Sequence, residues 1–457
     1  MKKYDFAILG GGPAGYTAAL KAAKMKKKVA LIEEDALGGT CLNRGCIPTK
    51  TLLETAGLVE KIREADKFAV QTTKKVSIDK DALRNRKNNI TETLKGGLQQ
   101  MILSSGIDII SGRGVLKGKD TIKVCGEEKY EIQAEKILIA TGTREASLKI
   151  DGSEHMMTST DALEIENIPD SICIVGGGVI GVELATFYNG IGCKVYIMEA
   201  LSKVLSNLDE EMSNLMRKQL VERGIEIHEN CFVQRIEKDQ DNRFQVYYTT
   251  GDEEQAINVG GVLNATGRTP NTEGLGLEEC GVKLTNKGYI EVDEFTKTAA
   301  DHIYAAGDVS GGVLLAHVAF HEGRIAAENA FGAQISTGSK TAVPQCIYTH
   351  PEMASVGLTE EQAKAKFKKL RKGYFSLGAN GRALAAGDNS GIVKVITEQE
   401  FGQIVGVHII GERATEVIGT AVIAIEGEYT CEEFSELIIP HPTVCEALKD
   451  AASGCVR

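Results

Sequence analysis

The stretch YDFAILGGGPAG, residues 4–15, decides the fold of this 457-residue chain. An apolar strand runs directly into the pattern G-x-G-x-x-G, and a helical stretch rich in Ala and Lys follows. A second apolar strand, residues 29–32, ends at Glu33. Glycines at such a turn let the backbone approach a pyrophosphate at a helix N-terminus, and the acid accepts ribose hydroxyls. We therefore predict a dinucleotide-binding βαβ unit at the beginning of the chain.

The same arrangement recurs at residues 172–199. The strand ICIV precedes GGGVIG, residues 176–181, and the next strand, residues 195–198, ends at Glu199. The acid follows the first glycine by 23 residues in both units. One G-x-G-x-x-G is weak evidence in a chain with 50 glycines, but two with the same offset are strong. They predict two dinucleotides, and Glu199 favours NAD over NADP because a carboxylate repels a 2′-phosphate.

Further glycine-bearing segments fit the first nucleotide domain. KILIATGT, residues 136–143, predicts a buried strand that enters a turn, and GVLNATGR, residues 261–268, echoes it. HIYAAGD, residues 302–308, predicts a third strand that ends at an acid. Ligands bind at the carboxyl ends of strands in open α/β sheets. Taken alone, Gly307-Asp308 would be read equally well as an ordinary turn.

The segment GGTCLNRGCIPTK, residues 38–50, places Cys41 and Cys46 five positions apart. In a regular helix that spacing means about 7.5 Å of rise and about 140° of rotation. A disulfide needs Cα atoms within about 7 Å and converging Cβ vectors. The pair can close only where the chain is distorted, and Gly45 and Pro48 supply the means.

The chain has 11 cysteines, an odd number, without metal-type spacing. In a chain without a secretory signal, most are expected to be reduced core residues. This interpretation applies to Cys125, Cys173, Cys193, Cys231, Cys280, Cys346 and Cys431.

The pattern changes from about residue 342 onward to longer alternating strands, such as residues 393–397 and 404–410. Thr359 and Gln362 have capping-box spacing and predict a helix start. This α+β region has no nucleotide fingerprint, so it is a candidate oligomerisation module. It ends in IPHPTVCE, residues 439–446, where Glu446 could orient His441 as a catalytic base. Alternatively, Thr443 and Glu446 form a capping box for a helix over residues 444–452.

Composition excludes several classes of protein. The net charge of −11 argues against nucleic-acid binding, and no apolar run approaches the roughly 20 residues of a membrane span. The N-terminus has no signal-peptide pattern, so we expect a cytoplasmic protein.

Taken together, these residues resemble the pyridine nucleotide–disulfide oxidoreductases over essentially the whole chain. The resemblance is carried by residues 38–50, both fingerprints, Ala-Gly-Asp at 306–308 and His-Pro-Thr-x-x-Glu at 441–446. The sequence of residues 38–50 is more similar to the branch of the family that oxidises dihydrolipoamide than to the glutathione-type reductases. Arg44 departs from that branch, which usually has a small apolar residue there, and puts a positive charge near the cysteines.

The resemblance implies an α/β fold of two doubly wound, Rossmann-like dinucleotide-binding domains and an α+β C-terminal interface domain. The FAD-binding domain would comprise residues 1–145 and 272–341, the NAD-binding domain 146–271 and the dimerisation domain 342–457. The family forms homodimers in which each site takes its histidine and glutamate from the partner's C-terminal segment.

The resemblance also implies roles for individual residues. Cys41 and Cys46 would form the redox disulfide, with Cys46 facing the flavin, and His441 with Glu446 would be the base. Lys50 would pair with Glu183 beside the flavin, and the His441–Pro442 bond would be cis. No metal is expected. FAD would be bound by Gly10, Gly12, Pro13, Ala14, Gly15, Glu33, Gly39, Thr40, Lys50, Gly114, Thr141, Gly142, Gly307, Asp308 and Ala316. NAD would be bound by Gly176, Gly178, Val179, Ile180, Gly181, Glu183, Glu199, Val233 and Gly267.

The implied reaction is oxidation of protein-bound dihydrolipoamide to lipoamide, with electrons passing through the disulfide and FAD to NAD. No lipoyl-carrying segment precedes the flavin domain, so the lipoyl group would come from another chain. That chain would be an acyltransferase of a 2-oxoacid dehydrogenase or acetoin-cleaving complex, or a glycine-cleavage carrier protein. One alternative is another FAD-dependent NAD(P)H disulfide reductase, of glutathione or mercuric type. A mercuric reductase would need a cysteine pair near the C-terminus, where only Cys455 stands. Another alternative is a flavin-binding scaffold without turnover.

Overall fold

The computed structural model describes residues 1–73, 75–127, 129–338, 340–388 and 390–456. The chain divides into two compact units. Unit 1 comprises Met1–Thr49, Asp81–Ala146 and Gly267–Gly338, and unit 2 comprises Lys50–Lys80, Ser147–Thr266 and Ser339–Arg457. Each unit contains a parallel sheet that begins at one of the two predicted fingerprints.

Strand β1 (Lys2–Leu9) lies inside the main sheet of unit 1, between β2 (Val29–Glu33) and β6 (Lys129–Ile139). β3 (Asp108–Ser111) pairs with β2, and β16 (Ile303–Ala305) pairs with β6, all in parallel. β5 (Thr121–Cys125) and β4 (Arg113–Lys117) extend the sheet beyond β6 in antiparallel order. Both faces of β1 are buried, as expected for a parallel sheet covered on both sides.

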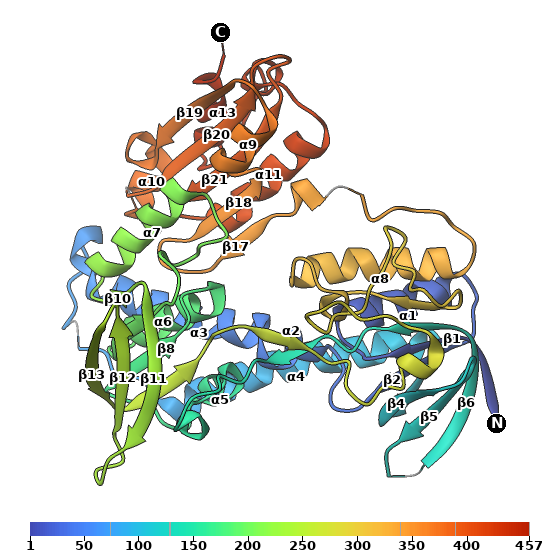
Figure 1. Cartoon of the computed structure of the whole chain (residues 1–457). Coiled ribbons are helices and arrows are strands. Elements are labelled where there is room, and N and C mark those ends of the chain that lie inside the picture. Colours follow the sequence, from blue (N-terminus) through green and yellow to red (C-terminus); the bar gives the residue numbers. More distant parts are fainter. Residues whose placement is uncertain (74, 128, 339, 389, 457) are drawn as a thin grey trace. The chain divides into compact units, whose positions relative to one another are not determined.

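Helices α1 (Pro13–Lys24) and α8 (Ala316–Ala330) lie side by side in unit 1 (Figure 1). They pack on the face of the sheet that carries Phe6, Ile8 and Leu138. The two helices touch backbone to backbone at Gly323, where a Cβ would overlap the carbonyl oxygen of Ala14. The unit also contains the long helix α4 (Lys80–Ser104) and the two-stranded pair β7 (Thr143–Glu145) and β15 (Arg268–Pro270).

The first half of unit 2 repeats the nucleotide-binding architecture. Its parallel sheet has the order β10 (Glu226–His228), β9 (Lys194–Met198), β8 (Ser171–Val175), β14 (Gly261–Asn264). The segment 261–268 was grouped with the first nucleotide domain because it echoes residues 136–143, although the implied NAD-binding range 146–271 also contains it. Its strand lies in the second sheet, next to β8. Helix α6 (Val179–Gly190) follows β8, and an antiparallel sheet of β11 (Cys231–Lys238), β12 (Phe244–Thr250) and β13 (Glu253–Val259) is attached.

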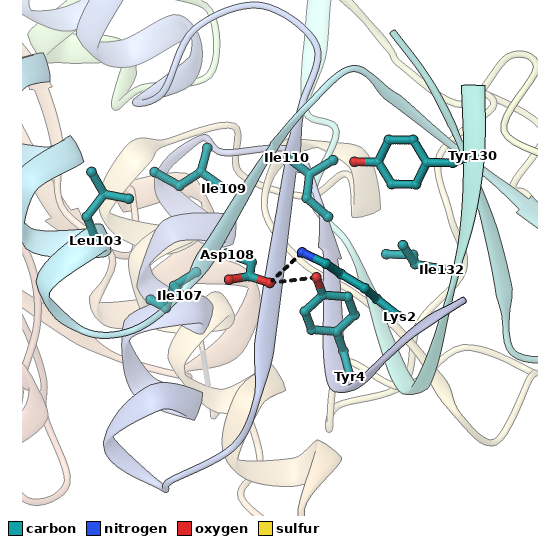
Figure 2. A pocket seen from close by; sticks show the side chains of 9 residues that line it. All are labelled: Lys2, Tyr4, Leu103, Ile107, Asp108, Ile109, Ile110, Tyr130 and Ile132. Atoms are coloured by element: carbon teal, nitrogen blue, oxygen red, sulfur yellow. Dashed lines mark hydrogen bonds and ion pairs between the residues drawn. The ribbon is translucent and has the colours of Figure 1, made fainter. Parts of the chain in front are cut away.

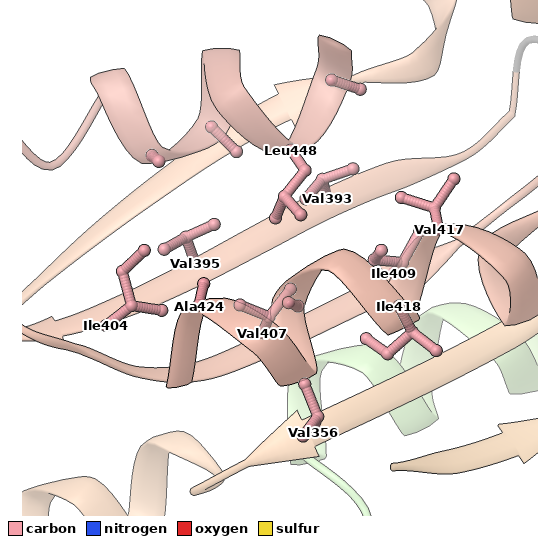
Figure 3. Close-up of a cluster of buried hydrophobic side chains, with 14 of the residues drawn as sticks. Val356, Val393, Val395, Ile404, Val407, Ile409, Val417, Ile418, Ala424 and Leu448 are labelled. Atoms are coloured by element: carbon pink, nitrogen blue, oxygen red, sulfur yellow. The ribbon is translucent and has the colours of Figure 1, made fainter. Parts of the chain in front are cut away.

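The C-terminal part of unit 2 is an α+β module, as the alternating pattern predicts. Its antiparallel sheet has the order β17 (Gln345–Ile347), β18 (Met353–Gly357), β21 (Ile404–Ile410), β20 (Ile392–Glu398), β19 (Leu370–Ser376). Figure 3 shows the core of this module, where valines of β20 and β21 contact side chains of α11 (Ala414–Glu426) and α13 (Glu446–Ser453). The predicted capping box is present, because Thr359 and Gln362 exchange hydrogen bonds at the start of α9 (Glu360–Lys366).

The remaining helices are short, apart from α3 and α7. They are α2 (Gly39–Arg44), α3 (Cys46–Arg63), α5 (Ser159–Glu164), α7 (Glu210–Glu222), α10 (Gly381–Ala386) and α12 (Cys431–Ser435). Single 3-10 turns lie at Ala65–Phe68, Ser153–His155, Glu278–Cys280, Asp308–Ser310, Lys340–Ala342 and Leu377–Ala379. Among the described residues, no helix combines the length and the apolar character that a membrane span requires.

A completely buried lysine joins α7 to the C-terminal module within unit 2. The ammonium group of Lys394 on β20 lies 2.9 Å from carboxylate oxygens of Asp209, Glu360 and Glu211. Burial lowers the pKa of Lys394, but its hydrogen bonds to these carboxylates outweigh burial and hold it above its usual value. Burial raises the pKa values of Asp209 and Glu360, but hydrogen bonds outweigh it, so both lie below the ordinary range.

We predict that Lys394→Met lowers the free energy of unfolding by about 3 kcal/mol, because it leaves the fully buried Asp209 without its lysine countercharge and removes one of the three lysines bound to Glu360. Urea unfolding at neutral pH measures the loss. In the native protein the two carboxylates stabilise the fold above their unfolded pKa values of about 4, and this contribution is lost as pH falls through the lower folded values. Lys372→Met is the control, because it removes a partly exposed ion pair to the same Glu360, worth under about 1 kcal/mol. Equal losses in both variants would contradict the prediction.

Candidate active site

The first glycine turn is built by direct backbone contact. Gly10 has a φ of +102°, a conformation that favours glycine, and a Cβ at Gly15 would overlap the Gly10 carbonyl oxygen. Gly12 caps α1, and the cap supplies no side-chain hydrogen bond to the first N–H groups of the helix. Glu33, at the end of β2, accepts the N–H of Gly11 at 2.6 Å. Burial raises the pKa of Glu33.

The second glycine turn has the same geometry. Gly176 has a φ of +112°, and a Cβ at Gly181 would overlap the Gly176 carbonyl oxygen. Glu199 accepts the N–H of Gly177 at 2.6 Å, as Glu33 does with Gly11. Gly178 caps α6, and a Cβ there would meet nothing within 4 Å. Open space at an uncapped helix N-terminus beside a carboxylate fits a pyrophosphate and its ribose.

The other residues expected at the nucleotides fall into both units. Thr141 donates to the carbonyl of Asn271 at 2.8 Å, and Asp308 accepts from Thr143 at 2.9 Å. Burial raises the pKa of Asp308, although the Thr143 hydroxyl opposes this. In unit 1 the structure also places Pro13 and Ala14 at the start of α1, Gly39 and Thr40 in α2, Gly114 in β4, Gly142 after β6, Gly307 before Asp308, Ala316 at the start of α8, and Gly267. In unit 2 it places Lys50 in α3, Val179, Ile180 and Glu183 in α6, and Val233 in β11.

The cysteine segment is distorted where the sequence predicted. Cys41 lies in α2 and Cys46 begins α3, and Gly45 separates the two helices with φ and ψ of −146° and −108°. Pro48 lies in the first turn of α3, where proline is tolerated. Burial, followed by the charges of Cys41 and Cys46, raises the pKa of Tyr16 on α1 to about 12. Tyr16 is thus a neighbour of both cysteines that sequence reasoning missed, and no local motif marks it.

The charge of Arg44 is paired. Sequence analysis placed a positive charge near the cysteines, and the structure pairs the Arg44 guanidinium with Asp35, in the loop after β2. The pKa of Glu33 is raised by burial, and the charge of the Arg44 guanidinium partly opposes this rise. Arg44 therefore interacts with the acidic loop beside the first nucleotide turn.

The expected ion pair between Lys50 and Glu183 is present in unit 2. The Lys50 ammonium lies 2.9 and 2.7 Å from the two Glu183 oxygens, and it stacks 4.5 Å from the centre of the Tyr348 ring. Glu183 also accepts the backbone N–H of Tyr348 at 3.0 Å. Glu183 is only 4% exposed, so Lys50 neutralises a buried carboxylate.

His441 and Glu446 also form the expected pair. Nδ1 of His441 lies 2.9 Å from Glu446 Oε1, and Glu446 Oε2 accepts the N–H of Thr443 at 2.8 Å. Glu446 therefore orients the imidazole and binds the backbone of Thr443, but the Thr443 hydroxyl donates to the carbonyl of Pro440, so the alternative of a capping box is not formed. The helix begins at Glu446 rather than at residue 444. The His441–Pro442 bond is cis, as expected, and the His441 side chain is 81% exposed.

A cavity of about 590 Å³ lies elsewhere in unit 1 (Figure 2). Tyr4 donates to Asp108 at 2.7 Å in it, and Lys2 lies 3.7 Å from the same carboxylate. None of the residues expected at the nucleotides or at the disulfide lines this cavity. Within the described residues, no group of three or more histidine, cysteine or acidic side chains is arranged to hold a metal ion.

Comparison with known families agrees with this geometry. Residues 4–323 match the pyridine nucleotide-disulphide oxidoreductase family, and residues 343–452 match the dimerisation domain of the same family. The chain belongs to the pyridine nucleotide-disulphide oxidoreductases, which makes it an oxidoreductase.

Individual relatives match over nearly the full length. A dihydrolipoyl dehydrogenase of Bacillus subtilis (strain 168) is 41% identical over 97% of both chains. A dihydrolipoyl dehydrogenase of Geobacillus stearothermophilus is 36% identical over 98% of this chain and 96% of its own. Among solved structures, LpdA of Mycobacterium tuberculosis matches with a TM-score of 0.91 and 28% identity over 100% of both chains. The HOCl-induced flavoprotein disulfide reductase RclA of Escherichia coli matches with a TM-score of 0.88 and 30% identity, over 98% of this chain and 99% of its own.

We predict that Gly15→Ala abolishes flavin retention, because its Cβ collides with the Gly10 carbonyl and must displace α1 from β1. Gly96→Ala is the control, since a Cβ there meets nothing within 4 Å and alanine favours the interior of α4. Both proteins are purified alongside the native chain, and bound flavin is quantified by absorbance after gel filtration. A Gly15→Ala protein with a full complement of flavin would refute this account of the turn.

Proposed function

We propose that this protein oxidises protein-bound dihydrolipoamide to lipoamide, using a Cys41–Cys46 disulfide and FAD, with NAD as electron acceptor. The helix break between Cys41 and Cys46 carries the proposal, because the two cysteines flank it in the unit that holds the first nucleotide turn. Dihydrolipoyl dehydrogenases at 41% and 36% identity over almost the whole chain support the substrate class.

The domain division follows from the same proposal. FAD is assigned to residues 1–145 and 272–341, NAD to residues 146–271, and the dimer interface to residues 342–457. When bound, FAD would supply the acceptor for an electron pair from the dithiol, and NAD would supply the final acceptor that takes the pair as hydride. Glu33 and Glu199 hold the ribose of each nucleotide, and Glu199 favours NAD over NADP by repelling a 2′-phosphate.

The protein side chains carry out the thiol chemistry. His441 takes a proton from one substrate thiol, because only a thiolate attacks a disulfide. That thiolate bonds to Cys41 Sγ, and Cys46 leaves as a thiolate. The sulfur of the second substrate thiol then displaces Cys41 and closes the lipoamide disulfide, and its proton passes to the leaving Cys41 thiolate. Cys41 ends as a thiol and Cys46 as a thiolate, so both are reduced, and His441 keeps the first proton. Hydrogen bonds from the Thr443 N–H and from His441 lower the pKa of Glu446, so an ionised carboxylate faces the imidazole and orients it.

Anaerobic turnover with NADH tests the substrate class. The enzyme should reduce lipoamide with a kcat/KM at least about tenfold above that for glutathione disulfide or Hg(II), a difference of about 1.4 kcal/mol. Preference for glutathione disulfide or Hg(II) would identify the corresponding reductase instead. A flavin spectrum that does not change on addition of NADH would identify a scaffold without turnover.

The two cysteines should have distinct roles. Cys41 follows the Gly38-Gly39 turn and meets the substrate, whereas Cys46 begins α3 and faces the flavin. Cys41→Ser should therefore show a long-wavelength absorbance from the Cys46 thiolate against the flavin without added reductant, and Cys46→Ser should lack it. Both variants should lose lipoamide turnover, and the opposite pair of spectra would reverse the assignment.

We infer a homodimer in which His441 serves the partner's disulfide. The match of residues 343–452 to a dimerisation domain and the 81% exposure of the His441 side chain support this arrangement. The lipoyl group would arrive on another chain, as the lipoyl domain of an acyltransferase or as a glycine-cleavage carrier.

Subunit mixing tests catalysis in trans. Cys41→Ser and His441→Gln proteins, each inactive alone, are mixed and allowed to exchange subunits. In a mixed dimer one site receives both lesions and the other receives neither, so activity should rise towards half that of the native dimer. If His441 served its own subunit, every site would keep one lesion and no activity would return.

A further inference from the structure

Helix α3 has a glycine where a helix interior normally excludes one. Gly57 lies in the interior of α3 (Cys46–Arg63), where glycine costs roughly 1 kcal/mol relative to alanine. A Cβ at Gly57 would lie 2.6 Å from Nε2 and 2.9 Å from Cε1 of His350. The glycine therefore opens a notch in which an imidazole rests directly on the helix backbone.

The imidazole is also hydrogen-bonded to that backbone. Nε2 of His350 lies 3.2 Å from the carbonyl oxygen of Leu53, in the turn of α3 that ends at Gly57. Because a carbonyl only accepts, Nε2 carries the proton and donates it. Burial lowers the pKa of His350, and the nearby Arg223 and Lys61 lower it further against Glu54 and the Leu53 bond, so the ring is neutral at neutral pH.

The residues next to His350 contact the same helix at a second position, nearer its N-terminus. Tyr348 stacks against the Lys50 ammonium and donates its N–H to Glu183, which holds Lys50. Thr349, between Tyr348 and His350, is fully buried. Its hydroxyl donates to the carbonyl of Pro351 at 2.6 Å, so the segment is fixed on both sides of the imidazole.

The residues of α3 that Tyr348 and His350 contact lie on one face of the helix. Lys50, Leu53 and Gly57 have the spacing i, i+3, i+7, which aligns them along a single stripe. One contact is at Lys50 and the other at Leu53 and Gly57. Two contacts at different heights on the same face fix the rotation of a helix about its axis and its position along that axis. Cys46 is the first residue of this helix, so its sulfur moves with the helix.

We propose that His350 is a positioning residue for helix α3. Its imidazole lies against Gly57 and donates the Nε2–H to the carbonyl of Leu53, and these contacts fix the placement of Cys46 and Lys50. The proposal rests on the proposed function, in which Cys46 leaves as a thiolate against the flavin. Reactions between positioned groups are sensitive to such placement, and an error of about 1 Å can cost about a hundredfold in rate.

Two substitutions separate the hydrogen bond from simple packing. His350→Gln keeps an N–H donor, whereas His350→Leu fills similar space without one. In the FAD-loaded dimer, His350→Leu should lower kcat for lipoamide about tenfold and leave KM for NAD within about twofold. It should also shift the equilibrium of the Cys41–Cys46 disulfide with dithiothreitol by at least about threefold. His350→Gln should recover both quantities to within about twofold of the native values.

The readouts distinguish positioning from general stability. Native kcat and native disulfide equilibrium in His350→Leu would overturn the proposal, and so would equal losses in the Leu and Gln variants. A loss of kcat accompanied by the same loss in affinity for NAD would also overturn it, because a loosened fold affects both nucleotide sites.

A double-mutant cycle provides a second test should His350→Leu fold poorly. Gly57→Ala alone should lower kcat, because its methyl group displaces the imidazole, whereas in a His350→Ala background the same methyl group should cost nothing further. Gly97→Ala is the matched control, since a Cβ there meets nothing within 4 Å. Additive effects of Gly57→Ala and His350→Ala would overturn the proposal.

The disulfide equilibrium requires no lipoamide, so it separates this proposal from the proposed function. A native enzyme that fails to oxidise dihydrolipoamide, with a disulfide equilibrium that still shifts in His350→Leu, would remove the proposed function and keep the positioning role. Native turnover in His350→Leu would remove only the positioning role.

Discussion

Backbone contact between each nucleotide-binding helix and the strand before it is the constraint on which the rest of the structure depends. Gly15 touches the Gly10 carbonyl, and Gly181 touches the Gly176 carbonyl, so neither position tolerates a Cβ. With these contacts in place, α1 begins at Pro13 and α6 at Val179, and each helix has a glycine cap that makes no side-chain hydrogen bond. Glu33 and Glu199 then complete each turn by binding the N–H of its second glycine. The same physical solution thus serves two nucleotides in one chain.

Much of this was predictable from the sequence, because the rules involved act over a few residues. Glycine spacing between apolar strands predicted both βαβ units, and the mismatch between a disulfide and a regular helix predicted the break at Gly45. Local spacing also predicted the Thr359 cap. Resemblance to a family supplied the Lys50–Glu183 pair, which the structure has. Placement of the 261–264 strand needed the sheet order, which the echo of residues 136–143 did not provide.

Contacts between distant parts of the sequence were not predictable in this way. Lys394 and Asp209 are 185 positions apart, and nothing in the strand pattern around Lys394 distinguishes it from an outward-facing lysine. His350 and Leu53 are 297 positions apart, and Gly57 alone would pass for an ordinary weak point in a helix. Arg44 attracted notice as a departure from a family pattern, but its partner Asp35 lies across a turn. In each case the tertiary fold decides which charges and rings meet.

The buried Lys394 cluster limits how evolution or an engineer can recombine this chain. Lys394 and Glu360 of this cluster belong to the C-terminal module, whereas Asp209 and Glu211 belong to the nucleotide-binding segment before it. A chimera that takes the module from one relative and the nucleotide segment from another inherits half of the cluster. Unless the donor carries an acid at the start of α7, the graft encloses a lysine with too few countercharges. The two segments are therefore exchangeable separately only between relatives that share these acids, although each segment has a sheet of its own.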